Sequence, residues 1–155
     1  MKLAETSHRK IESFFREYLD DKSFSLPQSY FYTGRFSRIF TAILGVHGIT
    51  FGQQIFILPS LVSRAENQKI KLPESLVVHE VTHVLQYRQE GVLRFVYKYL
   101  KSYWSNLKPE QRWNITARRQ AYLAIPYEIE ARRTAAEFVK WSESFTQRQK
   151  TRFEN

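Results

Sequence analysis

The sequence predicts an α+β fold in a single domain spanning residues 1–155, with its folded core at about 29–148. The length and the 43% hydrophobic content suit one well-buried core and are too small for two. Aromatic and β-branched residues broken by glycines fill residues 29–58, a pattern typical of a small, mainly antiparallel sheet. After Pro59 the pattern is helical almost to the end, so we expect the sheet to pack against helices.

The first expected element is an amphipathic helix at 5–19, in which apolar residues recur at helical spacing between charged ones. The next long helix is expected at 73–90, because Pro73 suits a first helical turn and Gly91 suits a stop. Short links separate the helices that follow. These are expected at 92–106, 109–123 and 126–148.

Composition limits the classes of function. The chain has no cysteine, which excludes disulfides and thiolate metal ligands and leaves histidine and carboxylate for a zinc site. The net charge of +9 would suit an anionic partner, yet Lys and Arg are spread along the chain, so no specific nucleic acid is predicted. Neither a signal peptide nor a spanning segment is recognisable, and we expect a cytoplasmic protein.

Residues 76–91 read LVVHEVTHVLQYRQEG and place two histidines and a glutamate among valines. At about 100° per residue the valines of this helix share one apolar face with Leu85. His79 and His83 project from nearly the opposite side, one turn apart, with Glu80 beside them. This spacing lets both imidazoles reach one zinc ion while the glutamate touches its water. We therefore interpret His79 and His83 as metal ligands rather than as residues of an exposed helix face.

Two imidazoles hold zinc poorly, so a third protein ligand is needed. On the helix at 126–148, Glu128 shares a face with alanines and Glu130 points the other way. A carboxylate on an apolar face is costly to bury unless a cation compensates it, which makes Glu128 the predicted ligand. Two alternatives stay open. In one, Glu128 serves only to stabilise the positive end of its own helix dipole; in the other, His47, beside a strand, is the third ligand. His8 lies among charges and is expected to be solvated.

The HEVTH and YEIEA segments resemble zincin metallopeptidases of the gluzincin type, in which HExxH lies on one helix and a later helix supplies a glutamate. GITFGQQIFILP, which precedes the first of them, resembles the strand of small bacterial zincin-like domains, many of unknown function. The resemblance covers roughly residues 45–140. It implies a zincin-like fold, one zinc ion held by His79, His83 and Glu128, and hydrolysis of a peptide or protein substrate.

The resemblance also implies a mechanism. Zinc lowers the pKa of its water and polarises the scissile carbonyl, while Glu80 takes the proton and hands it to the leaving amine. A strand at about 49–58 would pair with an extended peptide by edge addition. Tyr122 and Tyr127, close in sequence to Glu128, are candidate donors to the oxyanion, although either also suits the core.

One departure from the gluzincin pattern concerns Arg132, where that group usually places an aspartate that orients a zinc histidine. A backbone carbonyl, Asn114 or another glutamate would have to replace it; otherwise the site is weakened. Arg132 therefore also fits a second function, a zincin-like module that binds or scaffolds without catalysis.

A third function follows from VLRFVYKYLKSYW at 92–104, where Lys and Arg alternate with rings. Such a segment suits a membrane surface or a nucleic acid. We prefer to interpret it as a helix that shields the zinc helix, with basic side chains lying over apolar surface. The sequence carries no signature of an oligomeric state.

Overall fold

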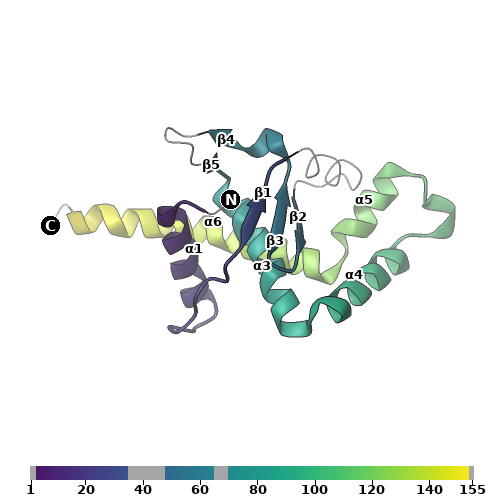
Figure 1. The fold of residues 1–155 in the computed structure, drawn as a ribbon, viewed down its shortest axis with the longest axis horizontal. Helices are drawn as coiled ribbons and strands as arrows, with labels where there is room; N and C mark the ends of the chain where they lie inside the picture. Colours follow the sequence, from purple (N-terminus) through teal and green to yellow (C-terminus); the bar gives the residue numbers. More distant parts are fainter. Residues whose placement is uncertain (1–2, 35–47, 65–69, 154–155) are drawn as a thin grey trace.

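The computed structural model describes residues 3–34, 48–64 and 70–153 and has the predicted α+β fold in one domain (Figure 1). Within these residues it contains five α-helices and two small sheets. None of these helices is both long and apolar enough to cross a membrane. In chain order the elements are α1 (Glu5–Tyr18), β1 (Tyr30–Tyr32), β2 (Gly48–Phe51), β3 (Gln54–Ile57), η1 (Pro59–Leu61), β4 (Ser63–Arg64), β5 (Ile70–Lys71), α3 (Glu74–Glu90), α4 (Val92–Asn106), η2 (Pro109–Gln111), α5 (Ile115–Leu123) and α6 (Pro126–Phe153).

The main sheet has three strands in the order β1-β3-β2, and β4 pairs with β5 in a second, two-stranded sheet. β1 runs parallel to β3, whereas β2 and β3 form an antiparallel hairpin. Gly52 has φ +60° at the first position of the two-residue turn, a conformation that favours glycine there. The single strand expected at about 49–58 is therefore two strands. Since β3 is paired on both sides, β2 is the strand of this hairpin that lies at an edge of the described sheet.

The hydrophobic core lies between the sheet, α1, α3 and α6. α3 is central to it, because α3 contacts β2, α1, α4 and α6. Alternation along β3 turns Ile55 and Ile57 into the core, and the helical period does the same for the valines of α3. The fully or almost fully buried members of this core are Ile11, Phe14, Phe15, Phe31, Ile55, Ile57, Val77, Val78, Val81, Val84 and Phe138.

Two helix boundaries differ from those predicted. Residues 109–111 form a short 3₁₀ turn, and α5 starts only at Ile115, because the side chain of Asn114 accepts hydrogen bonds from the backbone N–H groups of Thr116 and Ala117. α6 continues to Phe153 instead of ending near 148. Figure 1 shows α6 running along the length of the molecule, with the α4–α5 hairpin at the end opposite the C-terminus.

Candidate metal centre

α3 is buried on two faces. Its valine face packs in the core as predicted, and Val77, Val78 and Val81 are almost fully inaccessible. The histidine face is covered as well: His83 is buried and His79 partly buried, because α4 and α6 pack over this side of the helix. The two histidines therefore face an enclosed junction of helices.

Three side chains converge at this junction, two from α3 and one from the first turn of α6. His79 Nε2 lies 3.3 Å from Glu128 Oε2, and His83 Nε2 lies 3.2 Å from Glu128 Oε1. One ligand atom from each of the three residues falls within 4.8 Å of the other two. The inward orientation of Glu128 agrees with the sequence prediction.

The spacing of these atoms fits a zinc ion. Tetrahedral zinc at about 2.0–2.1 Å from each ligand separates neighbouring ligand atoms by roughly 3.3–3.4 Å. The two nitrogen–oxygen separations are close to that value but run to different oxygens of Glu128. One ligand atom from each residue lies within 4.8 Å of the others, so the cluster could hold one metal ion. Two imidazoles and one carboxylate are also the donor set of a common type of catalytic zinc site. The residues present thus fit the metal that the sequence predicted.

Glu128 is 2% exposed, and both of its carboxylate oxygens have further hydrogen-bond partners. The hydroxyl of Tyr99 in α4 donates to Oε1 over 2.8 Å, and that of Tyr122 in α5 donates to Oε2 over 2.7 Å. Burial by itself would raise the pKa of this carboxyl, but the hydrogen bonds to His79 and His83 outweigh it and hold the pKa far below its usual range. The ionised carboxylate therefore ties four helices together.

Gln86 makes the contact that orients a histidine of the cluster. In gluzincins an aspartate usually makes such a contact, but this chain has Arg132 at the corresponding position. His83 Nδ1 lies 2.8 Å from Gln86 Oε1, while Gln86 Nε2 donates to Glu130 Oε2 over 2.9 Å and to the Tyr127 carbonyl over 3.3 Å. Because the amide nitrogen is used by these acceptors, the amide oxygen faces the imidazole, and His83 donates from Nδ1. In the structure His83 Nε2 faces Glu128 Oε1, and in the neutral Nδ1–H tautomer the lone pair of Nε2 would be available to a metal in place of that contact.

The sequence suggested Asn114 or another glutamate as the residue that orients a histidine in place of the missing aspartate, and only the glutamate takes part. Asn114 caps α5 and does not orient a histidine, because both of its backbone partners belong to that helix. Glu130 does take part, but through Gln86. Arg132 donates from Nη2 to the Leu123 carbonyl. Gln86 was missed, although its position three residues after His83 places both on one face of α3.

Glu80 lies on the other flank of the histidines and is 2% exposed. Thr50 in β2 donates its hydroxyl to Glu80 Oε2 over 2.6 Å, and the Thr50 carbonyl accepts a hydrogen bond from Tyr87. β2 approaches so closely at Gly48 that an added Cβ would stand 2.3 Å from Glu80 Oε1. Burial raises the pKa of Glu80, although the nearby histidines and the Thr50 hydroxyl act in the opposite direction.

The sequence profile of the eCIS core domain matches residues 3–91, more than half of the chain. The chain belongs to this family. The eCIS core domain is a zincin-like domain, related to metallopeptidases, of extracellular contractile injection systems. This confirms the zincin-like part of the resemblance that HEVTH suggested. No curated protein and no solved structure matches the chain.

The match to the eCIS core domain ends at the end of α3, so it contains only part of the cluster. α1, the described strands and the HEVTH helix fall within residues 3–91. Glu128, Tyr99 and Tyr122 come from the helices that follow. In this eCIS core domain the carboxylate that completes the cluster therefore belongs to a C-terminal extension of the matched segment.

The remaining candidates lie apart from the cluster or outside the described residues. His8 is partly buried on α1, and His47 lies outside the described residues. The hydroxyl of Tyr127 is hydrogen-bonded to Glu90 instead of Glu128. Tyr99 was not singled out from the sequence, yet its spacing of four from Phe95 marks it as a residue of the buried face of α4.

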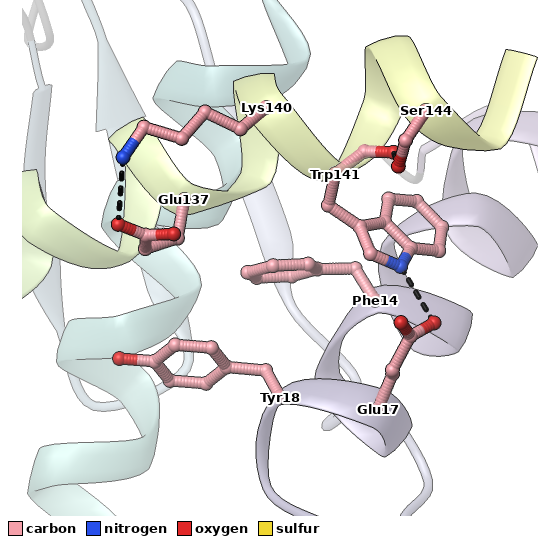
Figure 2. A pocket seen from close by; sticks show the side chains of 7 residues that line it. All are labelled: Phe14, Glu17, Tyr18, Glu137, Lys140, Trp141 and Ser144. Carbon is pink, nitrogen blue, oxygen red and sulfur yellow. Dashed lines mark hydrogen bonds and ion pairs between the residues drawn. The ribbon is translucent and has the colours of Figure 1, made fainter.

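A surface hollow between α1 and α6 contains none of the cluster residues (Figure 2). Its polar groups are paired with one another. Trp141 donates from Nε1 to Glu17, and Lys140 lies 3.1 Å from Glu137. The hollow is therefore a packing feature of two helices and carries no chemistry of its own.

Replacing Gly48 by alanine is expected to destabilise the domain by about 1–3 kcal/mol, because the new Cβ would collide with the carboxylate of Glu80. Denaturation in urea measures the change in unfolding free energy. Gly34→Ala is the matched control, since an added Cβ meets no atom within 4 Å there. In a Glu80→Ala background most of the Gly48→Ala cost should disappear; an equal cost in both backgrounds would contradict the contact.

Proposed function

We propose that this eCIS core domain binds one zinc ion through His79, His83 and Glu128 and hydrolyses peptide bonds in a peptide or protein substrate. The observation that carries the proposal is the convergence of two imidazoles and a buried carboxylate, with a second buried carboxylate, Glu80, beside them on α3. The fold places one acid on each side of a histidine pair. This arrangement is better suited to activating a water molecule than to packing a hydrophobic core.

Bound zinc supplies a water of lowered pKa and polarises the scissile carbonyl. Glu80 accepts the proton from the attacking water and passes it to the leaving amine. Thr50 fixes one oxygen of Glu80, so that the carboxylate holds one orientation beside His79 and His83. The raised pKa of Glu80 suits a group that must hold a proton and then release it.

The substrate is an extended peptide chain that pairs with β2. This strand lies at an edge of the described sheet, and it carries both Gly48 and Thr50 against Glu80. Pairing along its outer edge would bring a backbone carbonyl to the same side of α3 as the general base.

Tyr122 and Tyr99 position the carboxylate of Glu128 in this proposal. The predicted oxyanion role of Tyr122 requires its hydroxyl to leave Glu128 when a substrate arrives. Burial, the charge of Glu128 and the hydrogen bond to it raise the pKa of Tyr122 far above its usual range, so this hydroxyl remains a donor.

A second candidate is a zincin-like binding module in which the metal stabilises the fold without catalysis. The burial of the cluster favours this function, because structural zinc sites are closed whereas catalytic ones keep an open position. A module of this kind would gain thermal stability with zinc and would cleave no substrate, with or without Glu80.

Loss of Glu128 is expected to strip the metal, because two imidazoles alone hold zinc weakly. Metal analysis of the purified Glu128→Ala protein should find little zinc, whereas Glu143→Ala, at an exposed position of α6, and His47→Ala should retain about one ion per chain. Zinc lost from the His47 variant, or retained in the Glu128 variant, would contradict the proposed ligand set.

Replacing Gln86 by alanine is expected to weaken zinc binding by about 10–100-fold, because His83 loses the contact that fixes its ring and tautomer. Competition with a chromophoric chelator measures the affinity. Gln111→Ala, an exposed glutamine in η2, is the matched control and should bind zinc like the parent.

Glu80→Gln is expected to keep zinc and to lower peptide hydrolysis by about 10²–10⁴-fold, because the amide cannot accept the proton of the attacking water. Cleavage of an unfolded protein substrate, followed beside the zinc content, tests this. Full activity in the variant would exclude Glu80 as the base, and an inactive but zinc-stabilised parent would support the binding module.

A further inference from the structure

α4 has a second face that the metal centre does not use. Phe95 and Tyr99 point inward, where the Phe95 ring packs 4.1 Å from that of Tyr87 and Tyr99 reaches Glu128. On the outer side, large apolar residues recur at spacings of four, three and four. These are Leu93, Tyr97, Leu100 and Trp104, which are 87%, 65%, 49% and 54% exposed.

These four side chains form one stripe. At about 100° per residue they fall within a narrow arc of α4, roughly opposite Phe95. Trp113, between η2 and α5, and Ile115, the first residue of α5, are 92% and 80% exposed on the same helical hairpin. We name these six residues the hairpin stripe. Large apolar side chains grouped in this way on the surface of a protein often mark a place of interaction.

Basic residues border the hairpin stripe. Lys101 Nζ lies 6.0 Å from the centroid of the Tyr97 ring, and the guanidinium of Arg112 lies 5.8 Å from that of Trp104. Residues 92–124 contain seven Lys and Arg but only one acidic residue, Glu110. The hairpin therefore concentrates positive charge, although Lys and Arg are spread along the chain as a whole.

The chemistry of the surface favours a lipid bilayer over a protein partner. Tryptophan and tyrosine suit the boundary between headgroups and acyl chains, and the charged groups of Lys101 and Arg112 lie beside the rings, where phosphate would be within their reach. Four of the six residues lie along α4, on a hairpin at one end of the molecule, a shape that suits a flat membrane surface. The positive charge selects anionic headgroups.

We infer that the hairpin stripe docks this domain onto the surface of an anionic membrane, with the apolar side chains of the stripe in the headgroup region and the basic residues on lipid phosphates. The docking does not depend on the proposed hydrolysis, because none of the six residues belongs to the metal cluster. α4 then serves the two functions that the sequence offered as alternatives: its inner face shields the HEVTH helix and its outer face meets lipid.

Vesicle cosedimentation of the whole chain tests the docking. Binding to phosphatidylcholine vesicles containing phosphatidylglycerol is expected to be at least about tenfold tighter than to phosphatidylcholine alone and to weaken with added salt. Leu93→Ser with Leu100→Ser, and separately Lys101→Glu with Arg112→Glu, should each lower binding about tenfold or more. Val139→Ser and Lys22→Glu are the matched controls, exposed on α6 and after α1, and should bind like the parent.

Tryptophan fluorescence locates the contact, because the chain has three tryptophans and only two belong to the stripe. Brominated lipids should quench the Trp141→Phe protein, which keeps Trp104 and Trp113, and should leave a Trp104→Phe, Trp113→Phe protein unquenched. The remaining Trp141 lies in the hollow of Figure 2, where its ring nitrogen donates a hydrogen bond to Glu17. Quenching that persists in this double variant would overturn the proposal. Equal binding to both vesicle types would overturn it as well, and so would a dimer that forms through the hairpin stripe while the protein binds no vesicles.

Discussion

The carboxylate of Glu128 is the constraint on which the arrangement of the helices depends. Burying an ionised group costs several kcal/mol unless partners replace its hydration. Here the partners come from three other helices: two imidazoles from α3 and one hydroxyl each from α4 and α5. Each helix must therefore hold its position for the charge to be tolerated. A divalent cation between the imidazoles and the carboxylate would stabilise the same geometry further.

Glu80 creates a corresponding constraint on the side of the sheet. β2 approaches α3 closely because Gly48 has no side chain, and Thr50 then reaches the carboxylate. The short strands thus do more than cover the valine face of the helix. They fix the orientation of an acid beside the histidines, and β2 lies at an edge of the described sheet, where the proposed function places the substrate.

The segment matched by the family and the helices that follow it both contribute to the metal cluster. Residues 3–91 carry the sheet, the HEVTH helix and Glu80, while the later helices add Glu128, its tyrosines and the hairpin stripe. α4 connects these additions, because Tyr99 points to the cluster and Trp104 to the exterior. The chemistry of the centre and the proposed contact with lipid therefore meet in one helix.

The α+β class, the extent of α3 and the opposed faces of its valines and histidines followed from the sequence, because they depend on periodicity within a single segment. The inward side of Glu128 followed for the same reason. The sequence did not predict that residues 48–57 form two strands, or that Asn114 caps α5. It also did not predict the contacts of Gln86 and Tyr99. The hairpin and the cap are local features that the sequence interpretation did not separate from a single strand and a longer helix. The contacts of Gln86 with Glu130 and of Tyr99 with Glu128 depend on residues that meet across large separations in the chain. Gln86 meets Glu130, and Tyr99 meets Glu128, only because α3, α4 and α6 pack around one buried charge, and no pattern within a helix encodes its neighbours.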